Sequence, residues 1–276
     1  IGASLNIVLD IILVYGIDGY IPAMNVEGAA YASVIAQITM AVISLFLLLK
    51  KTPVSLKISF TLHPEIPRLL NMVGNLFIRT IALNVALYLA TSYATGYGKE
   101  YIAAYTISIN IWLLGAFMID GYSSAGNILS GKLLGAKEYK SLVILSNKLF
   151  KYGIVIGTII AIFGFIFYDA IGRIFTNEAI VLEQFYTVFW IVLITQPINA
   201  LTFIFDGMFK GMGEMKYLRN LLIWATGLVF IPTLLIFDFL GFKLTAIWIA
   251  FACWIIARGL PLVYKFRKKF IPLSED

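Results

Sequence analysis

Two polar side chains, Asn6 and Asp10, lie four residues apart in the otherwise apolar segment Asn6-Ile-Val-Leu-Asp10. Residues four apart share one face of a helix, about one turn from each other. A carboxylate beside an amide can hold a proton or an alkali cation, so the pair predicts a cation or proton site, with Na+ at Asp10 as the one metal ion to consider. The alternative is that Asp10 lies at the outer end of a short helix and is only solvated. The sequence leaves both interpretations open.

Four more ionisable residues, Arg79, Asp120, Asp206 and Arg258, lie inside long apolar runs. Such groups cost about 2.5 kcal/mol or more in hydrocarbon unless they are paired or face water, so each is a functional candidate. Arg79 and Asp120 are about equally deep when counted from the nearest basic loops, and Asp206 and Arg258 are both shallower. The expected ion pairs are therefore Arg79 with Asp120 and Arg258 with Asp206, with either a structural role between helices or a role in coupling.

The dipeptide Gln196-Pro197 interrupts another apolar run, and Asn199 follows it. Proline removes a backbone donor and bends a helix, which frees carbonyl groups in mid-span. Such a bend can serve alternating access between two sides of a membrane, or it can be static.

Residue counts exclude several kinds of chemistry. Cys253 is the only cysteine and His63 the only histidine, which excludes a disulfide framework and zinc sites built from Cys and His. The sequence also lacks a nucleophile or nucleotide motif, so we expect no enzyme and no cofactor. The net charge of +6 comes from basic residues in short loops, a pattern that reports membrane orientation and not nucleic-acid binding.

The elements that carry these residues are predicted to be membrane helices. Hydrophobic residues make up 61% of the chain and charged residues 13%, whereas soluble domains have about 45–50% and about 25%. Eight runs approach the roughly 20 apolar residues that a span needs. They are residues 1–16, 28–49, 69–96, 102–129, 149–168, 180–209, 217–237 and 244–264. The fold class is therefore all-α and polytopic, and residues 142–150 are expected to form a surface helix or a linker.

The placement of lysine and arginine predicts the direction of the spans. Of the 21 Lys and Arg residues, all but five fall in loops and tails on one side; the exceptions are Lys99, Arg173 and Lys243 opposite, and Arg79 and Arg258 inside spans. Cytoplasmic loops carry the excess of basic residues. We therefore expect a multi-pass protein of the plasma membrane, the inner membrane in bacteria, with a cytoplasmic C-terminus.

Several stretches together resemble the multidrug and toxic compound extrusion (MATE) family, and its DinF-like branch in particular. The resemblance rests on the order and spacing of these stretches across nearly the whole chain. The stretches are Asn6 to Asp10, Gly28-Ala-Ala-Tyr-Ala-Ser-Val-Ile-Ala-Gln37, Asp120-Gly121 with Gly131-Lys-Leu-Leu-Gly-Ala136, Gln196-Pro-Ile-Asn-Ala200, and Asp206-Gly-Met-Phe-Lys-Gly-Met-Gly213.

The resemblance implies a fold of twelve helices in two lobes, of which this chain would hold helices five to twelve and lack the first four. Residues 1–49 would then close the N-lobe, residues 50–68 would link the lobes, and residues 69–276 would form a complete C-lobe with a cytoplasmic tail.

The resemblance also implies a site. In the DinF-like branch, the cation is bound by an Asn and an Asp on the fifth helix, a hydroxyl on the sixth and an Asp on the first. The first three match Asn6, Asp10 and Ser33, and the first-helix Asp would lie in the missing part, which leaves the site incomplete in this chain. The NorM-like branch places a carboxylate on the tenth helix, where this chain has Asn199. This difference favours the DinF-like branch and leaves Arg79, Asp120, Asp206 and Arg258 with coupling or structural roles.

The function that follows is a secondary antiporter that exports organic cations or other amphipathic drugs in exchange for H+ or Na+, acting as a monomer in the lipid bilayer. Two alternatives stay open. One is a flippase for lipid-linked oligosaccharides, which is thought to share this fold but would need more cationic groups than two intramembrane arginines. The other is a fragment that does not transport.

Overall fold

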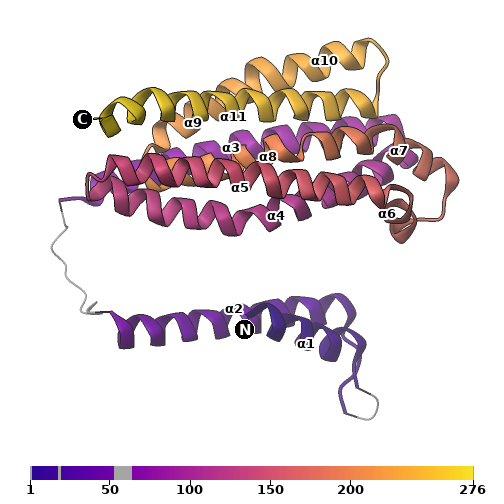
Figure 1. The fold of residues 1–276 in the computed structure, drawn as a ribbon. Coiled ribbons are helices and arrows are strands. Elements are labelled where there is room, and N and C mark those ends of the chain that lie inside the picture. The colour runs from indigo at the N-terminus through magenta and orange to yellow at the C-terminus, as the bar shows by residue number, and fades with distance from the viewer. Residues whose placement is uncertain (1, 18–19, 53–63, 276) are drawn as a thin grey trace. The chain divides into compact units, whose positions relative to one another are not determined.

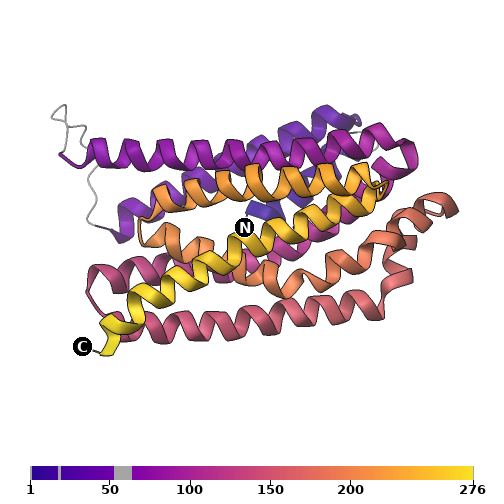
Figure 2. The same ribbon diagram turned by 90° about the horizontal axis from the view of Figure 1, so that it is seen from above.

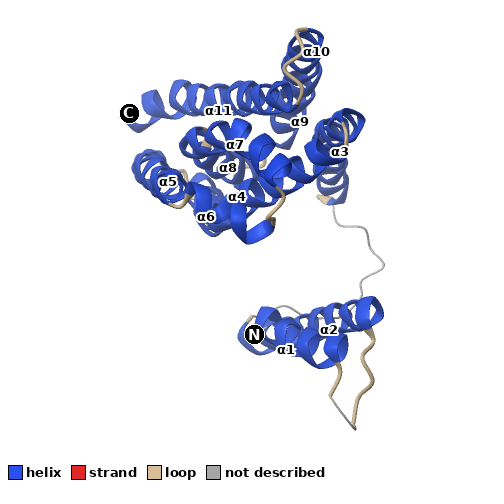
Figure 3. Ribbon diagram, turned by 90° about the vertical axis from the view of Figure 1, so that its right-hand side faces the viewer, coloured by secondary structure: helices blue, strands red, loops and turns tan. Residues whose placement is uncertain are grey.

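The computed structural model describes residues 2–17, 20–52 and 64–275. The chain divides into two compact units, Ile1–His63 and Pro64–Asp276, here called unit 1 and unit 2 and described separately (Figure 1). Their boundary falls within the expected linker 50–68, of which residues 53–63 lie outside the described part. The described residues form helices and no strand apart from one isolated bridge between Ile17 and Ile21, so the all-α prediction is confirmed (Figure 3).

Unit 1 is a hairpin of α1 (Gly2–Tyr15) and α2 (Asn25–Lys51). The buried residues of α2 are Gly28, Ala32 and Ala36, which are spaced by four and form one narrow stripe of small side chains. A Cβ atom on Gly28 would lie 2.4 Å from the carbonyl oxygen of Leu13, so the two backbones touch at this point. Small residues allow this close approach between membrane helices.

Unit 2 is a bundle of long helices that run side by side (Figures 1 and 2). In chain order these are α3 (Ile66–Tyr97), α4 (Lys99–Gly135), α5 (Tyr139–Ile166), α6 (Tyr168–Phe175), α7 (Ala179–Ile194), α8 (Gln196–Gly211), α9 (Met215–Trp224), the π-helix η1 (Ala225–Phe230), α10 (Ile231–Phe239) and α11 (Leu244–Glu275). Buried aromatic rings fill much of the interior, with Trp248, Phe251 and Trp254 of α11 among the largest.

The described residues of the eight predicted runs are mostly helical, but the runs 149–168, 180–209 and 217–237 are each divided between two or three helical elements, and eight full spans are not confirmed. Within the described residues, six helices are long and apolar enough to cross a membrane, and the bent pair α7 and α8 makes a seventh. Helix α1 has 14 residues, fewer than the roughly 20 needed.

Of the two alternatives for residues 142–150, the linker is wrong, because these residues are helical; they belong to the long helix α5 and do not form a separate short one. Leu142 and Leu149 are buried in a cluster with Ile204 and Met208 of α8. This apolar contact holds the segment against the bundle, while Lys148 on the same helix is exposed.

The bend expected at Gln196-Pro197 is present. Helices α7 and α8 meet at 52° across Thr195, and Pro197 lies in the first turn of α8. The hydroxyl of Thr195 donates to the carbonyl oxygens of Ile191 and Val192, at 2.9 and 3.0 Å. The carbonyl of Ile191 also accepts the backbone N–H of Thr195 at 3.2 Å, so the hydroxyl adds a second hydrogen bond there and one at Val192, where the helix is interrupted.

A second irregularity occurs in the span from Met215 to Phe239, which changes to a π-helix over η1. The N–H of Ile231 donates to the carbonyl of Thr226, five residues earlier, and Pro232 follows. Proline clashes with a carbonyl four residues back in an α-helix, and the wider turn places this proline where the helix can continue.

The bend at Pro197 is packed against a glycine of α5. A Cβ atom on Gly157 would lie 2.6 Å from the Cα atom of Pro197 and 2.7 Å from the carbonyl oxygen of Gln196. Both of these atoms belong to the backbone and have little freedom to move, so the contact requires glycine at this position.

We expect Gly157→Ala to destabilise the protein by about 1–3 kcal/mol, because the added methyl group overpacks a rigid contact. The matched control is Gly74→Ala on α3, where a Cβ atom would meet nothing within 4 Å. Alanine is favoured over glycine in helices by roughly 0.5–1 kcal/mol, so the control should be neutral or stabilising. Thermal unfolding of the purified protein in detergent measures both, and equal Tm values for the two variants would contradict the packing argument.

Candidate functional site

The predicted cation site of unit 1 is only partly assembled by α1 and α2. Asn6 and Ser33 line one cavity of about 250 Å³, which Gln37 and Met40 also border. The Nδ2 atom of Asn6 is buried and has no hydrogen-bond partner among the described residues. Asp10 lies one turn further along α1 and is half-buried. The structure therefore brings Asn6 and Ser33 together and adds Gln37, an amide that the sequence reading did not single out.

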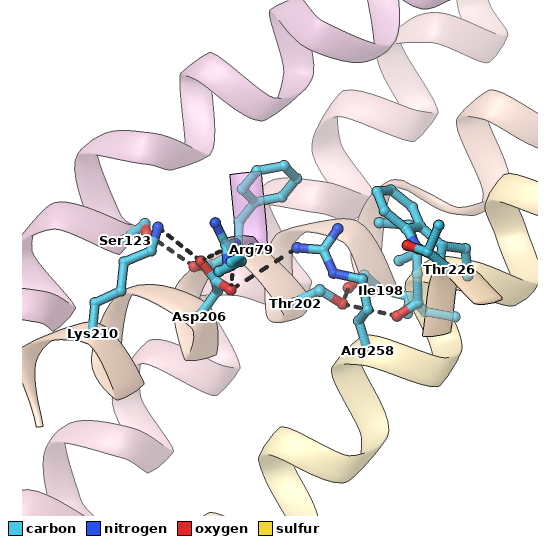
Figure 4. A network of polar contacts seen from close by, with 11 residues as sticks. Arg79, Ser123, Ile198, Thr202, Asp206, Lys210, Thr226 and Arg258 are labelled. Carbon is cyan, nitrogen blue, oxygen red and sulfur yellow. Dashed lines mark hydrogen bonds and ion pairs between the residues drawn. The ribbon is translucent and has the colours of Figure 1, made fainter. Parts of the chain in front are cut away.

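The most concentrated polar cluster of unit 2 surrounds the buried carboxylate of Asp206 on α8 (Figure 4). The Nη2 atom of Arg79 on α3 donates to both of its oxygens, at 2.7 and 2.8 Å. The Nζ atom of Lys210, one turn along α8, lies 2.8 Å from Oδ2. The Nη2 atom of Arg258 on α11 lies 4.0 Å from Oδ1. One carboxylate thus joins three helices, and we call these four residues the Asp206 cluster.

Arg258 is held in the cluster by an aromatic ring as well as by charge. Its guanidinium carbon lies 4.5 Å from the ring centre of Trp254, one turn earlier on α11. The indole Nε1 of Trp254 donates to the hydroxyl of Thr226 in η1, at 3.0 Å. Cations are attracted to the face of an indole ring, and this attraction is stronger away from water. The π-helix, Trp254 and Arg258 therefore form one connected arrangement.

Helix α8 presents a polar stripe that starts at the bend. Its members are spaced by three or four residues and so share one face: Gln196, Asn199, Thr202, Asp206 and Lys210. All except Lys210 are buried. The Oε1 atom of Gln196 and both polar side-chain atoms of Asn199 have no hydrogen-bond partner among the described residues.

The expected ion pairs differ from those observed. Arg79 pairs with Asp206 and not with Asp120, which is exposed on α4 and makes no ion pair with any described residue. Arg258 and Asp206 are neighbours as expected, at the longer distance of 4.0 Å. Equal depth in the membrane does not fix which way a side chain points around its helix, and this rotation decides the pairing.

The sequence reading also missed Lys210 and Thr202. Lys210 was counted as a marker of orientation at the end of a span, although its position four residues after Asp206 is the spacing at which helical side chains pair. Thr202 donates to the carbonyl of Ile255 on α11 at 3.3 Å, and no sequence signal indicated this contact.

An apolar cavity of about 490 Å³ lies between α4, α5, α6 and α7. Leu114, Phe163 and Phe189 contribute to its walls, and Gln196 supplies a polar side chain. A mostly apolar cavity of this size, with few polar groups, is typical of sites for small molecules.

Glu214, in the turn between α8 and α9, connects this turn to the end of α11. Its Oε2 atom lies 3.1 Å from Nζ of Lys265, and its Oε1 atom lies 2.8 Å from Nζ of Lys269. Burial alone would raise the pKa of the Glu214 carboxyl, but the hydrogen bonds from Lys269 and Lys265 outweigh it and hold the pKa below its ordinary value.

The described residues contain no group of three or more His, Cys, Asp and Glu side chains placed to hold a metal ion. In unit 1, side chains with oxygen atoms that line the cavity are Asn6, Ser33 and Gln37, and Asp10 lies one turn further along α1.

The model of the MatE family matches residues 76–236. The chain belongs to the MatE family. The match lies within unit 2, runs from α3 into α10 and includes Arg79, Asp206 and Lys210. Members of the MatE family are transporters and not enzymes, and this chain is an integral multi-pass membrane protein.

Relatives agree with the MatE assignment. The chain is 30% identical over 217 residues to Protein DETOXIFICATION 42 of Arabidopsis thaliana, covering 79% of this chain and 41% of the relative. It is 26% identical over 275 residues to DNA damage-inducible protein F of Escherichia coli, covering 97% and 58%. A solved outward-facing multidrug resistance MATE family transporter superposes with a TM-score of 0.86 at 21% identity, covering 100% of this chain and 62% of that chain. The chain thus spans about half the length of these curated MatE relatives.

We expect Asp206→Asn to destabilise unit 2 more than Arg79→Gln does. Removing one partner of a buried ion pair costs about 3–5 kcal/mol because a charge is left uncompensated. The Asn variant leaves three cations without their carboxylate, whereas the Gln variant leaves Asp206 with Lys210. Thermal unfolding in detergent measures the Tm of both variants, and the Tm of Asp206→Asn should be the lower of the two.

The control for this comparison is Asp169→Asn, which breaks an exposed pair with Arg173 and should leave the Tm unchanged. If Asp206→Asn unfolds at the temperature of this control, the Asp206 cluster does not stabilise the fold.

We expect Glu214 to make stability fall in acid. Since its pKa in the folded protein is lowered, its contribution is complete above the ordinary Glu value of about 4.3 and is lost as the pH falls through the lowered folded value. Unfolding measured between about pH 6 and pH 3 should show a shallower acid loss for Glu214→Gln than for the parent. Glu178→Gln, in the loop before α7, should keep the parent profile; identical profiles for all three proteins would contradict the role of Glu214.

Proposed function

We propose that the protein containing this chain is a secondary active antiporter that exports organic cations and related amphipathic drugs in exchange for H+ or Na+. The observation that carries the proposal is the MatE match over residues 76–236. The partners are then an amphipathic small molecule and the lipid bilayer, and the protein acts as a monomer whose C-terminus faces the cytoplasm.

The coupling site in this proposal lies in unit 1. Asn6 and Asp10 supply an amide and a carboxylate one turn apart, and the cavity beside Asn6 also receives the hydroxyl of Ser33. Oxygen donors of these kinds bind Na+, and the carboxylate alone can accept a proton. Occupation of Asp10 by the ion and binding of a cationic substrate would exclude each other, because both use the same negative charge.

Alternating access requires an element with two arrangements. The bent pair α7 and α8 supports this part of the proposal, because a break inside a span is a place where two halves can move relative to each other. The apolar cavity beside the bend, with Gln196 in its wall, supports an amphipathic substrate.

The test measures efflux of ethidium, a fluorescent organic cation, by the complete protein in proteoliposomes. A pH gradient and a sodium gradient are imposed separately, and the gradient that drives efflux identifies the coupling ion. We expect Asp10→Asn to remove the dependence on that ion, because the amide can neither release a proton nor supply the charge that attracts Na+.

Glu27→Gln, which changes a carboxylate of the same unit at the start of α2, serves as the matched control and should retain coupled efflux. The assignment of the coupling site fails if Asp10→Asn transports with the same ion dependence as the parent protein. The antiport proposal itself fails if neither gradient drives ethidium out of the vesicles.

A further inference from the structure

The Asp206 cluster contains more positive charge than its fold requires. Arg79, Lys210 and Arg258 surround a single carboxylate, so three formal positive charges meet one negative charge. Among the described residues, Asp206 is the only acidic side chain that forms an ion pair with any of the three. Uncompensated charge is costly in a protein interior, and one arginine would be sufficient to neutralise the carboxylate.

Two donors of the cluster are also unused. The Nε atom of Arg79 and the Nη1 atom of Arg258 are buried and have no hydrogen-bond partner among the described residues. Arg258 is only 3% exposed, and its guanidinium points toward the Asp206 carboxylate (Figure 4). Buried donors on charged groups are normally satisfied, because each unmade bond forfeits the hydration that the group had in water.

Among the described residues, helices α4 and α9 supply no acidic side chain that pairs with the cations of the cluster. Helix α4 contributes Ser123, whose hydroxyl donates to the carbonyl of Phe203, and its Asp120 is exposed. Helix α9 contributes a further cation, Arg219, which donates at 2.6 Å to Asn75, one turn from Arg79 on α3. The surroundings therefore leave the excess positive charge in place.

The chemistry that fits this arrangement is an oxyanion. Guanidinium groups bind carboxylates and phosphates through parallel hydrogen bonds, and a lysine adds a point charge. We propose that Arg79, Lys210 and Arg258 form a binding site for a carboxylate or phosphate group, which competes with the side chain of Asp206 for these cations.

The position of Lys210 gives an anion access to the Asp206 cluster. Its side chain is 33% exposed, whereas the carboxylate of Asp206 that it contacts is buried. Asp206 lies five residues before the end of α8 at Gly211, about 7.5 Å along the helix axis. A dissolved anion or the phosphate of a lipid headgroup can approach from this end of unit 2. Binding of an anion here requires neither a coupling ion at Asp10 nor transport.

The experiment measures binding without any ion gradient, so that its failure is distinct from a failure of efflux. Inorganic phosphate and succinate are titrated calorimetrically into the complete protein in detergent. In a parallel arm, the protein is reconstituted with equal amounts of phosphatidylglycerol and phosphatidylcholine, and the lipids retained after extraction are quantified. The first arm detects a dissolved oxyanion and the second a headgroup phosphate.

We expect saturable binding that Arg258→Gln and Lys210→Gln each weaken about ten-fold or more, as the loss of one charge-assisted hydrogen bond predicts. Lys216→Gln, which removes an exposed lysine from the start of α9, is the matched control and should bind like the parent. Asp206→Asn should bind more tightly than the parent, because the competing carboxylate is gone. A purely structural ion pair would give no such gain.

Saturable phosphate or succinate binding with this order of variants supports a dissolved ligand, and retention of phosphatidylglycerol over phosphatidylcholine with the same order supports a headgroup. If Arg258→Gln or Asp206→Asn does not fold, Lys210→Gln, which changes a side chain that is one-third exposed, still decides the question. The proposal is overturned if neither arm shows saturable or selective binding, or if Lys210→Gln and Asp206→Asn bind as the parent does.

Discussion

The ion pairing of the Asp206 carboxylate with its surrounding cations is the interaction on which the interior of unit 2 depends. It lies on α8 and receives Arg79 from α3 and Lys210 from its own helix, with Arg258 of α11 close by. Hydrocarbon offers no hydrogen-bond partners, so polar groups inside a membrane protein must find them within the protein. The helices that carry these partners are thereby fixed in rotation as well as in position, because each guanidinium must face the same point.

The bend before α8 and the π-helix before α10 are each connected to the Asp206 cluster, one by the polar stripe of α8 and the other by Trp254. The bend begins the polar stripe with Gln196, and the π-helix offers the Thr226 hydroxyl to Trp254, on whose ring Arg258 rests. Both irregularities occur next to a proline, Pro197 in one case and Pro232 in the other.

Much of this architecture could be predicted from the sequence, because the membrane restricts the choice of structure. Apolar runs located the helices, and Pro197 located the bend. Arg79, Asp206 and Arg258 were recognised because ionisable residues are rare in such runs. The partner of each ionisable residue could not be predicted, because the sequence gives the depth of a residue in the membrane and not the direction in which its side chain points or which helices are neighbours. Lys210 and residues 142–150 were assigned to loops or the membrane surface for a related reason. Lysines near the end of a span are typical of a loop, and only the structure shows that the opposite face of the same helix packs against the bundle.

The distance in sequence between the two main partners has a consequence for how the protein is made. Arg79 and Asp206 are separated by 127 residues. At a synthesis rate of about 5–20 residues per second, Arg79 is added to the chain roughly 6–25 seconds before Asp206. During that time the guanidinium of Arg79 cannot pair with Asp206 and must find other polar partners, such as lipid headgroups, water or the insertion machinery. The final depth of α3 is therefore set late, when α8 arrives, so that insertion and folding of this helix are one event.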